Sequence, residues 1–295
     1  MQADYQLWVK RSAYLTLCVA VLILVLKLWA VLLTDSSAML ASFTDAALDL
    51  LISVLNFAVL RYALRPADDN HSFGHGKAEA VMALLQAAFL AGAALLVLLQ
   101  AISGAKGQVT PQAPGFGMVI TLSCMALTLL LVLAQHWIIR RTGSLAVKSD
   151  SLHYRSDLLM NTAVLLALGM VWLGWLWADW LMAVLIALYL LWNAMQLARE
   201  SLQHLLDEQL PPEELLQIKQ LVLQHAHVLA CLQLRTRRAG PKVFIQCVLV
   251  LDDHWTLKQA HQIVDEVELK LQALYSGAEV MIHPEPRSDA ELLPE

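Results

Sequence analysis

Charged residues are scarce in this chain of 295 residues. Only 15% of its residues are charged, whereas an ordinary soluble protein has about 25%. A hydrophobic content of 58% excludes both a water-soluble globule and a disordered chain. The 12 glycines and 4 cysteines are too few for a collagen-like repeat or a disulfide scaffold. The formal net charge of -5 argues against a nucleic-acid partner, and the composition as a whole indicates a membrane protein.

Long apolar runs fill the first two thirds of the sequence. A membrane-spanning helix needs about 20 mostly apolar residues. Six runs meet this length, and they cover residues 12–33, 38–61, 79–103, 116–139, 145–172 and 177–198. None has the short apolar core and the cleavage site of a secretory signal peptide. The sequence therefore predicts a membrane domain of six transmembrane α-helices (1–207), a soluble domain (208–287) and a disordered tail (288–295).

The positions of Lys and Arg predict the orientation of these spans. Eight basic residues fall in segments on one side: Lys10, Arg11, Arg61, Arg65, Lys77, Arg140, Arg141 and Arg199. The opposite loops contain only Lys106. Because cytoplasmic loops carry the excess of positive charge, both termini are expected in the cytoplasm, as an even number of spans also requires.

Two predicted spans contain ionisable residues at helical spacing. Asp45 and Asp49 are four residues apart, as are His153 and Asp157, so each pair lies on one face of its helix. A charge at the centre of a bilayer costs about 2.5 to 3.5 kcal/mol even on the lenient insertion scale. Four such residues are therefore expected to have a function.

The expected depth of the four residues brings them to one level. Asp45 lies roughly 10 Å below the outer surface and Asp157 roughly 18 Å above the inner surface of a core about 30 Å thick. Because the two helices are antiparallel, Asp45 is expected to face Asp157, and Asp49 to face His153. Four such ligands can surround one divalent cation. Tetrahedral geometry suits zinc, and an oxygen and nitrogen set also admits Fe(II), Mn(II), Co(II) or Cd(II).

Two other interpretations of these acids are open. The carboxylates could pair with His153 or with Arg155 and simply hold the helices together, although three acids around one imidazole need a further cation. An intramembrane aspartyl protease would use Asp49 and Asp157 as a proton-sharing pair. No aspartate here follows the Gly-x-Gly element that such proteases carry.

The polar part of the chain has the signals of a small α+β domain. Pro211 and Pro212, followed by two glutamates, are typical of a helix start. Two alternating apolar runs flank a Gly-Pro turn and predict a β-hairpin. Thr256 and Gln259 form a capping box for a second helix, and a short strand ends near His283. The predicted order is αββαβ.

Several strings in the sequence resemble one transporter family, the cation diffusion facilitators. They are Ser42-Phe-Thr-Asp45-x-x-x-Asp49, Pro66-Ala-Asp68-Asp-Asn-His71-Ser-Phe-Gly-His75-Gly-Lys77-Ala-Glu79, Asp150-Ser-Leu-His153-Tyr-x-Ser-Asp157, Leu234-Arg-Thr-Arg237, Phe244-Ile-Gln246 and Ile282-His283-Pro. The resemblance implies a homodimeric, proton-coupled exporter of divalent metal in the bacterial inner membrane. Zinc is the expected substrate, with iron, cadmium, manganese or cobalt as alternatives. The transport site would be formed by Asp45, Asp49, His153 and Asp157.

The resemblance also assigns roles outside the spans. By spacing alone, Asp68, His71 and His75 are either a metal cluster or a solvated polar loop; the resemblance implies a metal site on the cytoplasmic side. Lys77 and Asp207 match positions that tie the membrane and soluble domains together at the dimer seam. The αββαβ segment matches the metallochaperone-like cytoplasmic domain of the family.

The soluble domain departs from the family pattern. The resemblance implies a histidine on each hairpin strand, where this chain has Leu232 and Val248. His261, His283 and Glu285 remain, and they could hold one structural zinc ion. The alternative is a metal-free domain with an apolar dimer contact at Leu232 and Val248.

Two rival functions remain open at this stage. A passive metal channel would need a continuous polar pore, and a membrane-tethered metal sensor would need a complete ligand set in the soluble domain. An enzyme is not expected, because the His-Glu-x-x-His, Gly-x-Ser-x-Gly and phosphate-loop patterns are missing. For an antiporter, His153 is the expected carrier of the coupling proton because its unperturbed pKa is about 6.5.

Overall fold

A computed structural model describes residues 2–34, 37–103, 115–172, 178–275 and 277–290. The chain divides into two compact units, Tyr5–Leu202 and Gln203–Glu295, the second of which also includes Met1–Asp4. The division falls between Leu202 and Gln203, whereas the sequence predicts it after Asp207. Lys106 lies outside the described residues.

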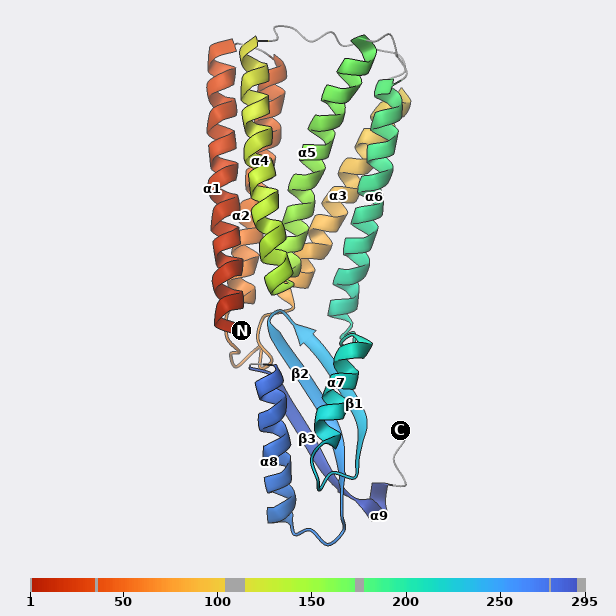
Figure 1. Ribbon diagram of the computed structural model, residues 1–295. Helices are drawn as coiled ribbons and strands as arrows, with labels where there is room; N and C mark the ends of the chain where they lie inside the picture. The colour runs from red at the N-terminus through yellow and green to blue at the C-terminus, as the bar shows by residue number, and fades with distance from the viewer. Residues whose placement is uncertain (1, 35–36, 104–114, 173–177, 276, 291–295) are drawn as a thin grey trace. The chain divides into compact units, whose positions relative to one another are not determined.

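Six long helices make up the first unit (Figure 1). They are α1 (Gln2–Thr34), α2 (Ser37–Ala63), α3 (Ala78–Ser103), α4 (Gly115–Thr142), α5 (Leu145–Trp172) and α6 (Ala178–Leu205). Helices α1 to α5 each contain one of the predicted apolar runs, and α6 covers its run of 177–198 except for residue 177, which lies outside the described residues. Most extend beyond the run at one end or both, because a helix continues past the apolar residues that mark the bilayer.

Four of the described helices are long and apolar enough to cross a membrane. The qualifying segments are Asp4–Leu33, Ser42–Ala63, Ala78–Leu99 and Val119–Thr142. The structure therefore contains a helical membrane unit. Four of the six predicted spans meet this criterion among the described residues, and the number six stays a prediction. Helix α5 does not qualify among the described residues, and it carries Lys148, Asp150, Arg155 and Asp157 within three turns.

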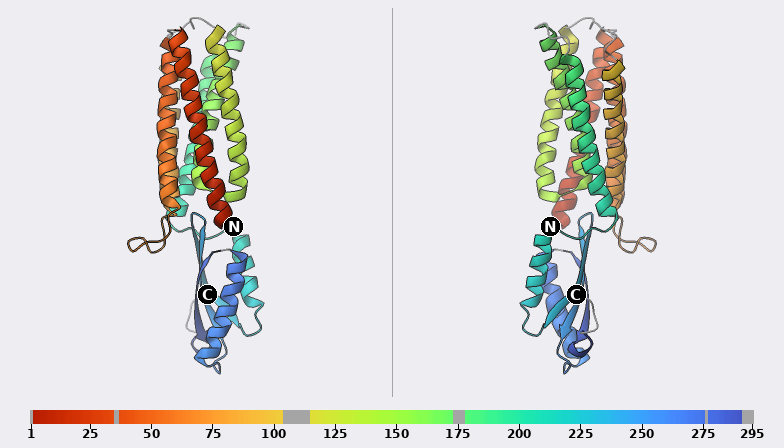
Figure 2. Two further views of the ribbon diagram at one scale, coloured as in Figure 1. Left: turned by 90° about the vertical axis from the view of Figure 1, so that its left-hand side faces the viewer. Right: turned by 90° about the vertical axis from the view of Figure 1, so that its right-hand side faces the viewer.

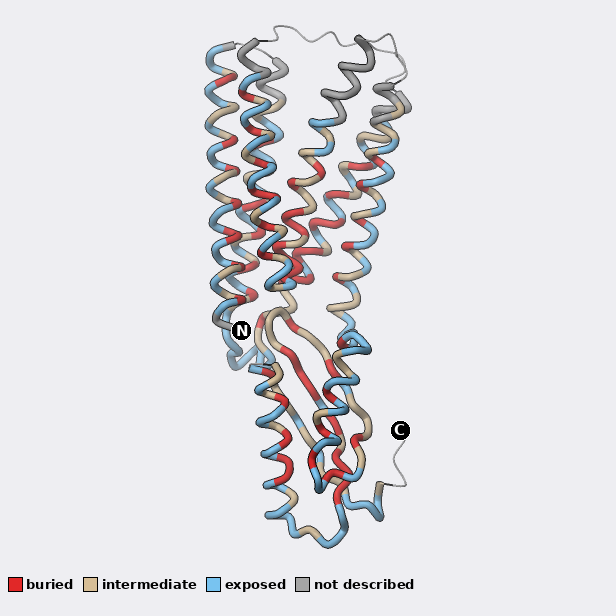
Figure 3. Tube along the Cα trace, viewed as in Figure 1, coloured by how far each residue is buried: buried red, intermediate tan, exposed pale blue. Residues whose placement is uncertain are grey.

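Small side chains line the contacts between these helices. Ala30, Ala83 and Ala146 are no more than 1% exposed, whereas Leu32 and Leu130 are 74% and 64% exposed. Figure 3 shows the buried positions recurring along the helices, densely so on α3, α4 and α5. Close packing of small residues is the usual basis of helix association in lipid, where apolar side chains have no water to escape. The exposed leucines are then the lipid-facing surface.

The second unit is a three-stranded sheet with helices on one face. Its elements are α7 (Pro212–Leu223), β1 (Ala230–Ala239), β2 (Lys242–Leu251), α8 (Leu257–Leu274), β3 (Glu279–Pro286) and α9 (Arg287–Ala290). The strand order is β1-β2-β3, with β1 antiparallel and β3 parallel to β2. Both α7 and α8 lie on the same side of the sheet in the two views of Figure 2. The predicted αββαβ order is present, with α9 added.

The local signals in this unit act as the sequence predicts. Pro212 stands in the first turn of α7, where its missing N–H costs nothing. The Thr256 side chain accepts from the Gln259 backbone, and the Gln259 side chain accepts from the Thr256 backbone, so the capping box is complete. In β1 the register shifts between Leu232 and Arg235, and Gln233 has φ 48°. This is a β-bulge, which bends the strand.

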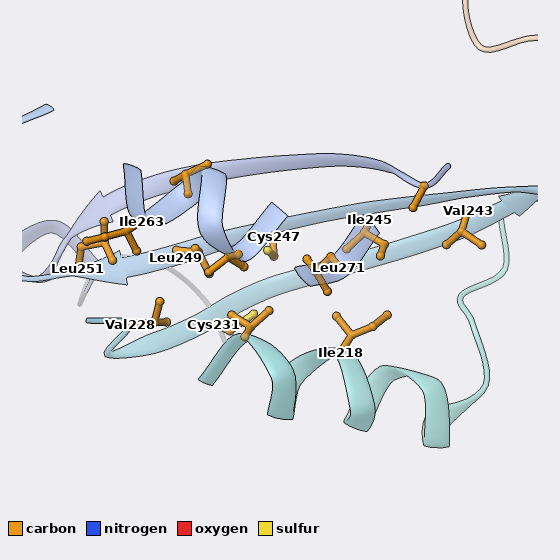
Figure 4. Packing of buried hydrophobic residues seen from close by; sticks show 14 of the residues in the cluster. Ile218, Val228, Cys231, Val243, Ile245, Cys247, Leu249, Leu251, Ile263 and Leu271 are labelled. Atoms are coloured by element: carbon orange, nitrogen blue, oxygen red, sulfur yellow. The ribbon is translucent and has the colours of Figure 1, made fainter. Parts of the chain in front are cut away.

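The core of the second unit lies between the helices and the sheet. Ile218 of α7, Leu249 of β2 and Leu271 of α8 are 0% exposed (Figure 4). Cys231 and Cys247 are 4% exposed in the same cluster. The neighbouring Cys231 thiol, together with burial, raises the pKa of Cys247. A protonated thiol inside an apolar core packs like a small hydrophobic side chain and does not act as a metal ligand.

The first residues of the predicted disordered tail, 288–290, belong to a short helix. Ser288 and Asp289 belong to α9, and the backbone N–H of Ser288 donates to Asp253 Oδ1 at 2.9 Å. This bond holds the first turn of α9 against the β2–α8 connection and explains why the segment is ordered. Residues 291–295 lie outside the described residues.

Candidate metal centre

Three of the four predicted transport ligands meet between α2 and α5. His153 Nε2 lies 3.2 Å from Asp49 Oδ1 and 3.8 Å from Asp157 Oδ2. One ligand atom from each of the three residues lies within 4.8 Å of the others. Their side chains are between 20% and 28% exposed. Two carboxylates and one imidazole are a ligand set that suits a divalent cation.

Asp45 does not join this group in the structure. It lies one turn before Asp49 on α2 and is exposed, and the described ligand group does not include it. Four residues of helix rise about 6 Å, so the two carboxylates of α2 sit at different heights. His153 meets Asp49, as antiparallel helices predict, and Asp157 forms a longer ion-pair contact with the histidine of its own helix.

Two hydrogen bonds join the helices next to this group. Tyr154 is 3% exposed, and its hydroxyl lies 2.8 Å from Ser53 Oγ of α2. Lys27 of α1 donates to the backbone carbonyl of Ser42 at 3.1 Å. These contacts join α1, α2 and α5 on either side of the ligands. Neither contact was evident from spacing, because each depends on how the helices pack.

A second cluster lies in the loop between α2 and α3. Asp68 Oδ1 is 3.1 Å from His71 Nδ1, and Asp68 Oδ2 is 3.3 Å from His75 Nε2. The two imidazole rings are 4.5 Å apart. The three residues form the other described group with ligand atoms within 4.8 Å of one another. The loop fold therefore brings together all three residues that the spacing singled out.

Burial and charge differ within the loop cluster. His75 is 6% exposed and packs edge-on against Tyr62, and its Nδ1 has no hydrogen-bond partner. Asp68 and His71 are about half exposed. The His71 backbone N–H donates to Asp68 and lowers the pKa of that carboxyl. A charged carboxylate beside two imidazoles suits a cation.

The residual ligands of the soluble domain are not brought together within one chain. His283 Nε2 is 2.9 Å from Glu285 Oε2, but His261 pairs with Asp265 at 3.7 Å. No described group of three ligand atoms includes His261. His261 and His283 are apart because they belong to different faces of the sheet. His261 is on α8, whereas His283 lies beside Val248 on the face turned away from α8.

Lys77 and Asp207 belong to different units of the structure. Asp207 follows α6 with φ 60°, and its Oδ1 accepts from Arg237 Nη1 at 3.3 Å. Lys77 lies directly before α3. A tie between Lys77 and Asp207 remains a prediction.

Two buried acids of the helical unit are not singled out by the sequence analysis. Glu79 and Asp150 are each 3% exposed. Asp150 is three residues before His153, so the spacing of a helix turn was the available signal. Both stand in strings that carry the family resemblance.

Both parts of the sequence match one protein family. Residues 13–206 match the cation efflux transmembrane domain, and residues 210–287 match the cytoplasmic domain of cation efflux proteins. The chain therefore belongs to the cation efflux family, the cation diffusion facilitators. It is a multi-pass membrane protein of a family of metal transporters, with a cytoplasmic domain.

The curated relatives are bacterial efflux pumps. The cation-efflux pump FieF of Escherichia coli O1:K1 / APEC is 42% identical over 288 residues, which are 98% of this chain and 96% of the relative. The same figures hold for FieF of Shigella sonnei (strain Ss046). Among solved structures, the zinc form of the putative zinc transporter CzrB is 35% identical to this chain, with a TM-score of 0.27. The match covers 28% of this chain and 96% of the CzrB chain. The chain is thus similar to FieF along almost its entire sequence.

Proposed function

We propose that this protein is a proton-coupled antiporter that exports divalent metal, zinc above all, from the bacterial cytoplasm. The observation that carries the proposal is the group Asp49, His153 and Asp157, whose ligand atoms lie within 4.8 Å between two helices of an apolar bundle. Asp45 is the fourth ligand, reached when α2 and α5 close around the ion. Such a mixed oxygen and nitrogen set suits zinc and also admits Fe(II), Cd(II), Mn(II) or Co(II).

Proton coupling follows from the chemistry of the ligands. Metal binds the deprotonated forms of His and Asp, so loading the site releases protons and acidification expels metal. If the site opens to each side of the membrane in turn, an inward proton gradient drives metal outward. His153 carries one of these protons.

The assembly is a homodimer with six spans per protomer and both termini in the cytoplasm. The basic residues near the ends of α1, α2, α4 and α6 support this orientation. The cluster of Asp68, His71 and His75 would then face the cytoplasm, where it binds metal on the way to the transport site. Lys77 and Asp207 tie the two domains together. The domains are residues 1–207 and 208–287.

Metal flux into liposomes tests the proposed site. The full-length protein is reconstituted, and zinc uptake is followed with an internal dye, with and without a pH gradient. Asp157→Ala and Asp49→Ala should abolish uptake, Asp45→Ala should reduce it strongly, and His153→Ala should weaken its dependence on pH. Asp69→Asn, an exposed loop acid next to Asp68, is the matched control and should transport normally.

Three results would contradict the proposal. Unchanged flux in Asp157→Ala would overturn the site assignment. Flux that ignores the pH gradient in the unaltered protein would favour a passive channel. Zinc binding without any flux would favour a membrane-tethered sensor.

A further inference from the structure

A buried carboxylate lies one helix turn from the proposed transport site. Asp150 of α5 is 3% exposed. Its Oδ2 accepts from Thr16 Oγ1 of α1 at 2.9 Å and from Gln135 Nε2 of α4 at 2.7 Å. Asn56 of α2 also interacts with the carboxyl group. Four helices thus meet at one acid that is not a metal ligand.

The hydrogen bonds around Asp150 leave acceptors without donors. Asp150 Oδ1 is buried and has no hydrogen-bond partner. The same is true of Asn56 Oδ1 and Gln135 Oε1, and these residues are 5% and 0% exposed. A buried acceptor without a donor is costly. One proton on Oδ1 would turn this unsatisfied acceptor into a donor.

We propose that Asp150 is a proton-binding site of the transport cycle, which holds a proton when the metal site is empty and gives it up when metal binds. The inference rests on the proposed metal and proton antiport. Asp150 does not touch the metal and acts as a second proton carrier beside His153. The ligand is the proton alone, bound to Oδ1 of the carboxyl group.

The position of Asp150 links its proton to the metal. Residues three apart in a helix are neighbours on one face, so Asp150 lies beside His153. The groups whose charge bears on Asp150 are His153 and Tyr154 of its own helix. The side chains that meet it from α1, α2 and α4 are the neutral Thr16, Asn56 and Gln135. A dication held by His153 therefore repels a proton on Asp150, and by linkage the proton weakens metal binding.

Proton release on zinc binding tests this role. The full-length protein in lipid nanodiscs and weak buffer receives zinc, and the protons released per bound zinc are counted between about pH 5.5 and 8. Asp150→Asn keeps the shape of the side chain and an oxygen that can accept from Thr16 and Gln135. It should release up to about one proton fewer per protomer while still loading zinc. Glu79→Gln, the change at an equally buried acid whose oxygens have donors, should release as many protons as the unaltered protein.

A second variant tests whether Asp150 binds the proton if Asp150→Asn does not fold. Gln135→Leu removes a donor to the carboxylate, so Asp150 should hold its proton about tenfold more tightly, and release should shift upward by about one pH unit. Proton counts in Asp150→Asn that equal those of the unaltered protein at full zinc loading would overturn the inference alone, as would an unshifted profile in Gln135→Leu. A protein that releases no protons at any pH would instead overturn the antiport itself.

Discussion

Glu79 and Asp150 differ in what their surroundings offer, although both are 3% exposed. Glu79 accepts from the Tyr5 hydroxyl at 2.8 and 2.9 Å and from Ser144 Oγ at 3.0 Å. As a carboxylate it is satisfied, and it joins α1 and α3 to the turn before α5. Asp150 has one satisfied oxygen and one without a partner. Hydrogen bonding, rather than burial, therefore separates a structural acid from a proton site.

Tyr275 gives a test of pH dependence at the scale of one residue. Burial and its hydrogen bond to Glu214 Oε2 at 2.8 Å raise the pKa of Tyr275 to about 12. The unfolded chain titrates near pH 10, so the folded state keeps the proton longer. Stability from this group is complete below about pH 10 and is lost as the pH rises through about 12. Tyr275→Phe should flatten that alkaline loss, as measured by urea unfolding of residues 203–290.

At neutral pH, Tyr275→Phe should change the free energy of unfolding only slightly. Removing the hydroxyl should cost about 1 kcal/mol or less, because the side chain is partly exposed. An alkaline loss of stability as steep in Tyr275→Phe as in the unaltered domain would show that another group titrates there.

At the scale of elements, hydrophobic periodicity predicts the helices and strands, whereas the sequence does not predict which helix faces contact each other. The apolar runs gave all six long helices, and the alternating runs, the Gly-Pro turn and the capping box gave the soluble domain. Helix spacing also placed Asp49 level with His153, as the 3.2 Å contact shows. The Ser53 to Tyr154 bond could not be read from the sequence, because no local pattern records which faces of two helices meet.

In the soluble domain, too, the sequence predicts local structure but not how the elements pack. Strand alternation correctly separates Cys231 and Cys247, which face the core, from Leu232 and Val248. Alternation does not tell which face of the sheet α8 covers, so the sequence leaves open a site that combines His261 and His283. Only the packing of α8 on the core face places these two histidines apart.

The core between α7, α8 and the sheet can be tested by truncating one side chain. Leu249 of β2 is 0% exposed, and Leu249→Ala should lower the free energy of unfolding by about 2 to 5 kcal/mol, because it leaves a cavity. Leu257, which is 83% exposed, supplies the matched control. Leu257→Ala should change the value by no more than about 0.5 kcal/mol. Urea unfolding of residues 203–290 measures both, and equal effects would mean that Leu249 is not a core residue.

At the scale of the whole molecule, the uncovered face of the sheet is where a second protomer is expected to dock. Leu232 is directly opposite Val248, and Val248 is beside His283. Met281 on the same strand is 63% exposed. An apolar contact gains about 25 cal/mol for each Å² that it removes from water, and it needs no ion.

Dimerisation is therefore expected to survive removal of metal. In detergent, the mass of the full-length protein measured by light scattering should remain that of a dimer after treatment with a chelator. Leu232→Asp should shift the protein toward the monomer, whereas Leu257→Asp, on an exposed site away from this face, should not. Dissociation on chelation would show that a metal ion still holds the interface.

The row formed by Leu232, Val248 and His283 also bears on how such a domain can change over evolution. Adjacent strands are about 4.8 Å apart, and the three residues share one face, so replacing two of them by histidine would set three imidazoles side by side without moving the backbone. A metal site on this face of the sheet could therefore be gained or lost by side-chain replacement alone, with the backbone of the three strands unchanged.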